Sequence, residues 1–185
     1  PERGKALALD RTTVYTNAVE KGVYKNALQG YLASTTYVDT QMGRILDALA
    51  ASPYKDNTIV ILGSDHGFHL GEKYHWQKGT MWEEGPHSLL SIKVPGMTKP
   101  KQVCNQIVSL LDIYPTLNDL CGLPNPTQTL SGKSLRPLLK DVEHPWKNAA
   151  ITGYSFQKPN LDETDVFLSV RTPDFRYINY GDGTE

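Results

Sequence analysis

The sequence predicts an α/β sandwich, in which helices flank a mostly parallel sheet and an antiparallel hairpin follows at the C-terminal end. Three observations carry this prediction: apolar residues recur at helical steps over 26–51, an uninterrupted apolar run fills 58–62, and a turn at 172–175 separates two strand-like segments. A strand that is apolar at every position is typical of a parallel sheet covered by helices on both faces. The alternation of helices and strands before the hairpin favours the same class.

The first third of the chain is expected to contain one long helix and one buried strand. Residues 1–25 are polar and mixed, and predict a loop with at most a short helical turn. The helix over 26–51 ends near Ser52, because a residue that precedes a proline is disfavoured in the α region. The buried strand covers 58–62. The helix face expected to pack inward is formed by Leu28, Leu32, Thr35, Val38, Met42, Ile45, Leu46 and Leu49.

The middle of the chain combines a long loop with regular elements. Residues 63–86 are rich in glycine, aromatic residues and histidine, and a loop of that length in a compact domain usually has a function. A second strand is expected over 88–94. Asp112 is expected to cap a helix that runs to residue 121, and Gly122 supplies the left-handed residue that commonly follows a helix.

The last third of the chain predicts short strands separated by loop. Residues 123–148 are rich in proline and lysine and predict a loop, followed by a third short strand at 149–152. Two further strand-like segments, 166–171 and 176–180, flank Pro173, which stands where a type I turn favours proline. These two segments form the predicted antiparallel hairpin.

Length, composition and charge limit the classes of function. The chain has 185 residues, which suits one domain or one and a fraction, and 39% of them are hydrophobic, so a sizeable core is expected. The formal net charge is −1, which argues against a nucleic-acid partner because such a surface needs a clear basic excess. No apolar run approaches the roughly 18 residues that a membrane span needs.

Asp65 and His66 directly follow the predicted buried strand and are the candidate metal ligands. Ligands of open α/β sheets bind beyond the carboxyl ends of the strands, and both residues lie at such an end. Aspartate offers a hard anionic oxygen, and neutral histidine offers a nitrogen suited to borderline metals. The alternative is that Asp65 caps the turn and His66 packs over it.

Lys78 is the candidate anion-binding and catalytic residue. Gly71 and Gly79 bound the segment around it, so this segment can fold back over the strand end. An ammonium group can pair with a sulfuryl or phosphoryl oxygen, whereas a lysine in a loop is otherwise a solvated surface charge. A metal ion and an ammonium group at one strand end would suit hydrolysis of a charged ester.

The sequence resembles the sulfatases of the alkaline phosphatase-like superfamily, and most of all their iduronate-2-sulfatase-like and choline-sulfatase-like members. The resemblance covers most of residues 26–185, and the order and spacing of its motifs carry it. These motifs are Tyr31-Leu32-Ala33-Ser34, Val38-Asp39, Gly43-Arg44-Ile45-Leu46, Asn57-Thr58-Ile59-Val60, Ser64-Asp65-His66-Gly67, Leu70-Gly71-Glu72, Trp76-Gln77-Lys78, Val94-Pro95-Gly96, Asp112-Ile113-Tyr114-Pro115-Thr116-Leu117, Gly132-Lys133-Ser134-Leu135 and Arg176-Tyr177-Ile178.

The resemblance implies a specific site within an alkaline phosphatase-like α/β sandwich. In such sulfatases a divalent cation, usually calcium, is held by two N-terminal carboxylates and by the pair that matches Asp65 and His66. The position matching Lys78 contacts the sulfate group, and His75 and Trp76 are expected to line the substrate pocket. A formylglycine made within a Cys/Ser-x-Pro-x-Arg motif attacks sulfur. The substrate is expected to be a sulfated small molecule or sugar, and the location periplasmic, secreted or lysosomal.

The chain departs from this pattern at the nucleophile. Neither Cys104 nor Cys121 fits the modification motif and no serine fits it, so the chain contains no nucleophile, and the two N-terminal carboxylates are also missing. We therefore expect residues 1–155 to be the C-terminal portion of a catalytic domain and 156–185 the start of a small antiparallel subdomain. Calcium prefers six to eight ligands. Without the remainder of the parent polypeptide, the chain alone is predicted to be inactive.

Two other functions stay open. A phosphodiester or phosphonate-ester hydrolase of the same superfamily would place Asp65 and His66 on zinc or manganese, although the spacing from Gly71-Glu72 to Trp76-Gln77-Lys78 favours sulfate. The chain could also belong to a non-catalytic binding module that retains the fold.

Overall fold

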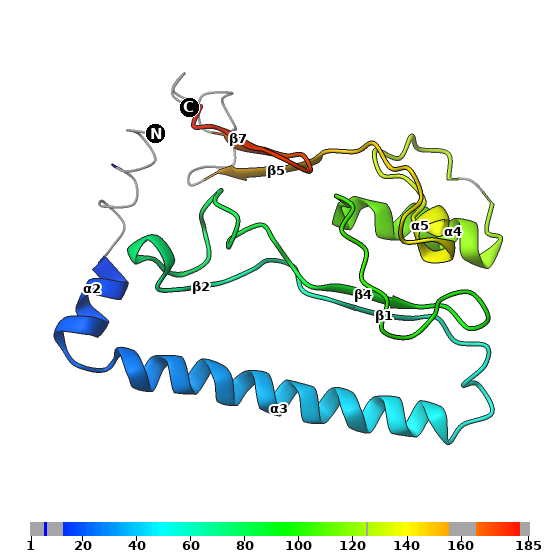
Figure 1. The fold of residues 1–185 in the computed structure, drawn as a ribbon, viewed down its shortest axis with the longest axis horizontal. Helices are drawn as coiled ribbons and strands as arrows, with labels where there is room; N and C mark the ends of the chain where they lie inside the picture. Colours follow the sequence, from blue (N-terminus) through cyan, green and yellow to red (C-terminus); the bar gives the residue numbers. More distant parts are fainter. Residues whose placement is uncertain (1–5, 7–12, 125, 156–165, 182–185) are drawn as a thin grey trace.

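The computed structural model describes residue 6 and residues 13–124, 126–155 and 166–181. The long helix of residues 24–50 runs along one side, and the strands within 60–93 lie next to it (Figure 1). The C-terminal sheet and a helical region lie on the far side of those strands. The helices are α2 (Thr13–Glu20), α3 (Tyr24–Ala50), α4 (Ile113–Cys121) and α5 (Arg136–Lys140). The strands are β1 (Val60–Gly63), β2 (His69–Leu70), β3 (Trp76–Gln77), β4 (Leu90–Lys93), β5 (Ala150–Ser155), β6 (Val166–Arg171) and β7 (Arg176–Asn179).

Helix α3 confirms the predicted long helix, and α2 corrects the prediction of a loop before it. The 3.6-residue apolar pattern of α3 is long enough to read from the sequence, whereas α2 has only eight residues and no buried side chain. Gly22, with φ of 67°, lies between the two helices. The ring of Tyr15 packs edge-on against that of Tyr24 at 5.3 Å between centroids, so α2 is supported by a contact with a residue of α3.

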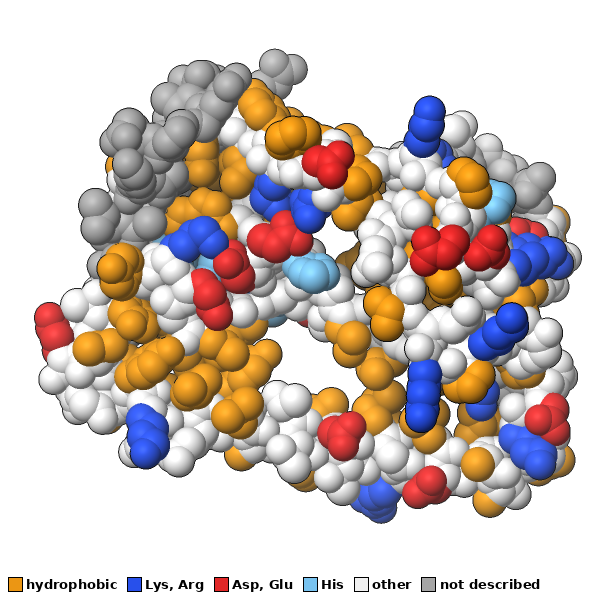
Figure 2. Space-filling model, in the orientation of Figure 1, with side chains coloured by type: hydrophobic (Ala, Val, Ile, Leu, Met, Phe, Trp, Pro, Cys, Tyr) orange, Lys and Arg blue, Asp and Glu red, His pale blue; other side chains and the backbone are white. Residues whose placement is uncertain are grey.

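The apolar face of α3 is present, but the described part of the chain covers it only in part. None of its residues is buried, and Leu32, Val38 and Ile45 are each more than half exposed. Figure 2 shows an opening between α3 and the strands above it. No helix in the described ranges has the length and apolarity that crossing a membrane requires.

Strands β1 and β4 form an antiparallel pair, with Val60 opposite Lys93 and Gly63 opposite Leu90. Every strand pairing among the described residues is antiparallel, so the predicted mostly parallel sheet is not found there. The apolar run was also expected to be buried on both faces, but β1 is only half-buried. An apolar run predicts burial without fixing the direction of the neighbouring strand. The segment between β1 and β4 contains no crossover helix, which a parallel pair would require.

The helical region confirms the helix predicted after residue 112 but moves its cap. A short 3-10 turn, Leu110–Asp112, precedes α4 and is capped by Ser109, whose hydroxyl accepts from Leu111 N. Asp112 is the other half of this capping box: its buried carboxylate accepts from the backbone N–H groups of Ser109 and Lys133, each at 2.8 Å. Gly122 follows with φ of 62°, as predicted. Within the described ranges, few apolar side chains are buried: Met81, Val94, Leu135, Leu138 and Tyr180.

The C-terminal sheet has the strand order β5-β6-β7 and is antiparallel throughout, which confirms the predicted hairpin. Strand β5 confirms the third short strand and extends it to Ser155. The predicted domain boundary at 155/156 falls at the start of segment 156–165, which lies outside the described residues, and it stays a prediction. The predicted loop over 123–148 contains one short helix, α5.

Candidate active site

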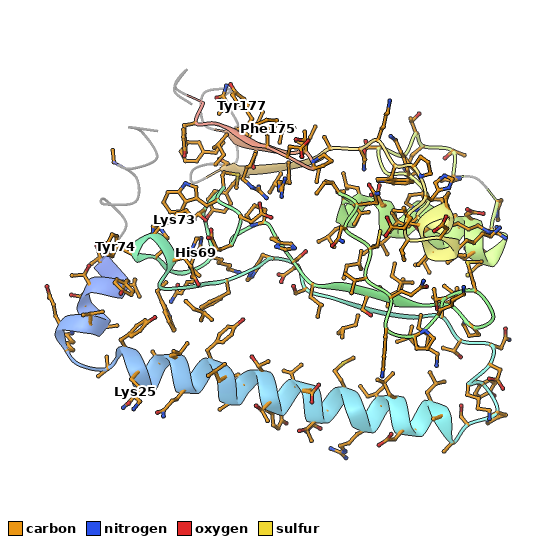
Figure 3. The ribbon with its side chains drawn as sticks, viewed as in Figure 1. Lys25, His69, Lys73, Tyr74, Phe175 and Tyr177 are labelled. Atoms are coloured by element: carbon orange, nitrogen blue, oxygen red, sulfur yellow. The ribbon has the colours of Figure 1, made fainter. Side chains whose placement is uncertain are left out.

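The chain between β1 and β4 is folded tightly, whereas the sequence predicted a long loop over 63–86. Strand β2 pairs with β3, and a 3-10 turn at Glu72–Tyr74 joins them. Lys73, Tyr74 and Gln77 have φ of 52°, 57° and 81°, a region that side chains rarely adopt. Figure 3 shows Lys73 and His69 together in this small hairpin, near helix α2. A two-residue strand is too short for a period-2 signal, which explains why the sequence did not reveal it.

Asp65, His66 and Lys78 come together at the end of β1. The Nζ atom of Lys78 lies 3.0 Å from His66 Nε2, and Asp65 Oδ1 lies 3.6 Å from the same nitrogen. The Asp65 side chain is 86% exposed and that of His66 is 33% exposed, so the site is open to solvent. The three residues that the sequence singled out for a cation and an anion therefore share one location.

The hydrogen bonds of His66 define its tautomer. Nδ1 lies 2.7 Å from the carbonyl oxygen of Gly67 and must donate to it, since a carbonyl only accepts. In a neutral ring Nε2 then carries a lone pair, which accepts from Lys78. Two acceptor atoms, Asp65 Oδ1 and His66 Nε2, converge beside an ammonium group. A backbone carbonyl that orients a histidine in this way is the usual support of a metal-binding imidazole.

The turn after His66 is closely packed against the segment 80–87. The N–H of Gly67 donates to the carbonyl oxygen of Gly85 at 2.7 Å. A Cβ atom at Gly67 would lie 2.2 Å from the carbonyl oxygen of Glu84 and 2.5 Å from that of His87. Gly67 is therefore required by close approach of two backbones, and this approach sets the position of Asp65 and His66 relative to the segment.

His69 and His75 form a buried aromatic cluster with Trp82. The two imidazole centroids are 5.4 Å apart, and both rings meet Trp82 edge-on. His69 Nε2 lies 2.7 Å from Thr80 Oγ1. Burial lowers the pKa of His69 below its ordinary value, although the charges of Glu84 and Glu72 oppose that shift. The cluster therefore holds a neutral histidine and packs the hairpin on segment 80–87.

Both remaining predicted substrate-binding residues, His75 and Trp76, pack against other aromatic rings. His75 is 5% exposed within the His69–Trp82 cluster. Trp76 is half-buried, with its ring edge-on to those of Tyr24 and Phe68 at 5.8 Å each. Their predicted contact with substrate stays a prediction.

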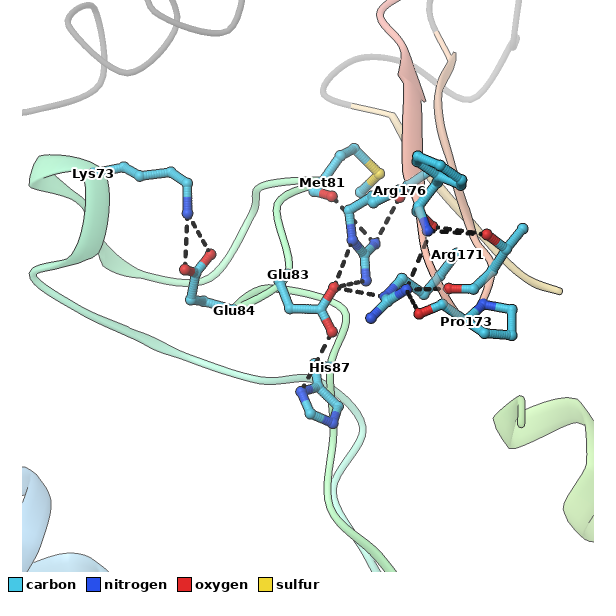
Figure 4. Close-up of polar contacts among 11 residues, drawn as sticks. Lys73, Met81, Glu83, Glu84, His87, Arg171, Pro173 and Arg176 are labelled. Carbon is cyan, nitrogen blue, oxygen red and sulfur yellow. Dashed lines mark hydrogen bonds and ion pairs between the residues drawn. The ribbon is translucent and has the colours of Figure 1, made fainter. Parts of the chain in front are cut away.

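Two neighbouring glutamates connect the segment 80–87 to partners on its opposite sides (Figure 4). Glu84 accepts from Lys73 Nζ at 2.8 and 3.0 Å. Glu83 Oε2 accepts from Arg176 Nε at 2.9 Å and from Arg171 Nε at 3.1 Å. No local signal in the sequence indicates the Glu83 contacts, because the partners of Glu83 lie 88 and 93 residues further along the chain.

Both glutamates have a pKa below the ordinary value. Partial burial raises the pKa of Glu83, but the hydrogen bonds and charge of Arg176, with the charges of Arg171 and His87, lower it by more. The pKa of Glu84 follows the same pattern: burial raises it, and the hydrogen bonds and charge of Lys73 outweigh that effect. Both carboxylates are therefore ionised at neutral pH.

These shifts predict acid destabilisation. Because the folded pKa values lie below 4.5, the ordinary value, the unfolded chain takes up protons at higher pH than the folded chain. The stabilisation is complete above about 4.5 and is lost as the pH falls through the folded pKa values. We expect the urea midpoint to fall as the pH is lowered from about 5 to about 3, and to fall less in the variant Glu83→Gln/Glu84→Gln. Parallel losses in both proteins would assign the acid sensitivity to other groups.

The donor set fits a divalent cation in part. Asp65 and His66 offer one oxygen and one nitrogen that can face one ion, in agreement with the tautomer of His66. No group of three or more His, Cys, Asp or Glu side chains that could hold a metal occurs within the described ranges. Cys104 and Cys121 are both free and exposed, and neither adjoins this pair. Further ligands would have to come from elsewhere.

Comparisons with known proteins assign the family. The family model "Sulfatase" matches residues 8–123, and the model "N-sulphoglucosamine sulphohydrolase, C-terminal" matches residues 71–185. A curated protein of Formosa agariphila named "Sulfatase" is 39% identical over 168 residues, which are 91% of this chain and 31% of that protein. The chain thus spans about a third of the length of this relative.

Solved structures agree on the fold. A structure in complex with its substrate D-glucosamine-2-N,6-O-disulfate matches with a TM-score of 0.76 and 31% identity, over 88% of this chain and 33% of the other. The phosphonate monoester hydrolase of Agrobacterium radiobacter matches with a TM-score of 0.69 and 31% identity, over 78% of this chain and 31% of the other. The described elements thus match part of the alkaline phosphatase-like fold, and the chain belongs to the sulfatase family.

Proposed function

We propose that the full-length protein that carries this chain hydrolyses sulfate esters, and that Asp65, His66 and Lys78 form part of its active site. The observation that supports this most is the meeting of Lys78 Nζ with His66 Nε2 at 3.0 Å, next to the Asp65 carboxylate. The ammonium group can bind an anion, and the two acceptor atoms beside it can bind a cation.

We assign the two acceptors to a divalent cation, which we take to be calcium from the family resemblance. The ion would polarise a sulfuryl oxygen and offset its charge. His66 Nδ1 keeps its hydrogen bond to the Gly67 carbonyl, which leaves the Nε2 lone pair for the ion. Lys78, which now donates to that lone pair, is then released to donate to the sulfate group.

Lys78 binds and orients the sulfate ester in this proposal. Because its ammonium group is held in place before the reaction, it stabilises the charge of the transition state more strongly than water would. The nucleophile, a formylglycine by family resemblance, lies outside this chain and would supply the attack on sulfur. The chain alone is therefore expected to be inactive.

We propose a sulfated sugar or other small sulfate ester as substrate, because the structural neighbour with 31% identity has glucosamine disulfate as its substrate. His75 and Trp76 are proposed to act at the substrate pocket by supporting the Lys78 segment, as their packing against other aromatic rings suggests. A periplasmic, secreted or lysosomal location is proposed from the family resemblance alone.

We further propose that the remainder of the polypeptide completes the fold. The half-buried strand β1 and the exposed apolar face of α3 offer surfaces for the parallel strands of an alkaline phosphatase-like sheet. The missing metal ligands and the nucleophile would come from the same part of the protein.

A phosphonate-ester hydrolase is the second candidate. The structural match to the Agrobacterium enzyme favours it, as does His66, because an imidazole nitrogen is a more typical ligand of zinc than of calcium, which prefers oxygen. Both functions use the same three residues, so geometry at this end of β1 does not separate them.

Turnover of matched esters by the full-length protein tests the proposal. We expect kcat/KM for nitrophenyl sulfate to exceed that for a nitrophenyl phosphonate monoester by at least about tenfold, a transition-state difference of about 1.4 kcal/mol. The reverse preference would favour the phosphonate-ester hydrolase. Absence of turnover with both esters, in protein that carries the modified nucleophile and calcium, would favour the non-catalytic module.

A further inference from the structure

Glu83 is the meeting point of two elements that lie far apart in the sequence. Its Oε2 atom lies 2.7 Å from Nη2 and 2.9 Å from Nε of Arg176, and 3.1 Å from Nε of Arg171. The two arginines stand opposite each other in the β6–β7 register. One carboxylate oxygen therefore accepts two charge-assisted hydrogen bonds and makes one further ion-pair contact, all with a single rung of the C-terminal sheet.

The two arginines are held in place by that sheet. Arg176 Nη1 donates to Ser169 Oγ at 2.7 Å, and the Arg176 side chain is only 15% exposed. Arg171 Nη1 donates to the carbonyl oxygens of Thr172 and Pro173 in the hairpin turn. Both guanidinium groups are thus already oriented when they meet Glu83, which reduces the entropy lost on pairing.

The backbone of Glu83 belongs to the segment that follows Lys78. Arg176 Nη1 also approaches the carbonyl oxygen of Met81, a buried residue of this segment. A Cβ atom at Gly79 would lie 3.3 Å from the Tyr154 hydroxyl of β5, so the sheet also lies against the residue next to Lys78. The C-terminal sheet therefore touches the segment 79–83 at three separate points.

The same segment reaches the Asp65–His66 turn from its far end. Gly85 accepts from Gly67 N, and Glu84 closes the loop from Lys73 by its ion pair. A shift of Glu83 would therefore move Lys78 on one side and the turn that carries His66 on the other. Figure 4 shows Glu84 pointing toward Lys73 and Glu83 pointing the other way, toward the two arginines.

We propose that Glu83 is a positioning residue: its ion pairs with Arg171 and Arg176 dock the C-terminal sheet on segment 79–87 and so hold Lys78 at the anion position beside His66. This inference rests on the proposed function for its catalytic consequence, but not for the docking itself. Glu83 does not touch the reacting groups. It acts through the backbone of the segment that follows Lys78.

The test compares Glu83→Gln with Glu143→Gln in the full-length protein. Glutamine keeps the size of the side chain and removes its charge, and Glu143 is an exposed glutamate in a distant turn. We expect Glu83→Gln to weaken inhibition by inorganic sulfate by about tenfold and to lower kcat/KM by about tenfold or more, since small displacements of a positioning group have effects of this size. Glu143→Gln should change neither quantity by more than about twofold.

Hydrogen exchange supplies a readout that does not depend on activity. Amides of 79–87 and 171–176 should exchange faster in Glu83→Gln, while those of α4 keep their wild-type rates. In the double variant Glu83→Gln/Arg176→Met the two effects should combine to less than their sum, because both changes remove the Glu83–Arg176 ion pair. Unchanged sulfate inhibition together with unchanged exchange would overturn the proposal.

The outcomes separate the inference from the function. If the wild-type protein does not hydrolyse sulfate esters, the proposed function fails, and the exchange of 79–87 still decides whether Glu83 docks the sheet. If Glu83→Gln does not fold, the milder Arg171→Lys is measured in the same way. Lysine retains the charge but loses the planar guanidinium. Faster exchange of 79–87 in that variant supports the proposal, and unchanged exchange contradicts it.

Discussion

Replacement of Lys78 by methionine should lower kcat/KM for an aryl sulfate by about 10²- to 10³-fold, because it removes the one ammonium group that faces His66 Nε2 at 3.0 Å. Methionine approximates the length of the lysine side chain and removes its charge. The loss should appear in both kcat and KM, since the ammonium group binds the sulfate group in the ground state and also stabilises the charge of the transition state. Steady-state kinetics of the full-length protein supply the measurement.

Lys93→Met is the matched control for this variant. Lys93 is an exposed lysine of β4, opposite Val60 in the register, and its replacement changes the net charge by the same amount. We expect its kcat/KM to remain within about twofold of wild type, as for most exposed substitutions. Equal losses in the two variants would attribute the effect to net charge and remove Lys78 from the site.

Gly67→Ala should destabilise the protein and impair the site together. The added Cβ atom would lie 2.2 Å from the Glu84 carbonyl oxygen and 2.5 Å from that of His87, and neither backbone can yield without movement of the segment. Overpacking of this kind typically costs about 1–3 kcal/mol of unfolding free energy. Because Gly67 adjoins His66, the shift should also separate His66 Nε2 from Lys78 Nζ and lower kcat/KM. Urea denaturation and steady-state kinetics measure the two effects.

Gly43→Ala provides the comparison for the glycine effect. A Cβ atom at Gly43 in α3 would meet nothing within 4 Å, so alanine there should be neutral or stabilising by about 0.5–1 kcal/mol. Equal unfolding free energies for Gly67→Ala and Gly43→Ala would contradict the close packing between the turn and segment 80–87.

Local signals were enough to predict the longer regular elements and to single out Asp65, His66 and Lys78, but not the short elements α2, α5, β2 and β3. The long periodic run of α3, the left-handed Gly122 and the turn before β7 each depend on neighbours within a few residues. Asp65 and His66 follow an apolar strand, and the end of such a strand is where α/β folds bind ligands. These features need no knowledge of distant parts of the chain.

The contacts that hold the site together could not be predicted in this way. Glu83 meets Arg171 and Arg176 across 88 and 93 residues, and a glutamate in a loop looks solvated when it is read alone. Ser109 caps the helical turn in place of Asp112, because the buried Asp112 carboxylate accepts from the backbone N–H groups of Ser109 and Lys133 instead. The direction of the strand next to β1 was missed because it depends on the path of the connecting segment.

The most direct test of the site is a crystal structure of the full-length protein with calcium and sulfate. We expect one cation at about 2.3–2.6 Å from an Asp65 oxygen, with His66 Nε2 also bound to it. A sulfate oxygen should accept from Lys78 Nζ at about 2.8 Å. A cation held without Asp65 and His66, or a sulfate bound where Lys78 does not reach it, would contradict the shared site at the end of β1.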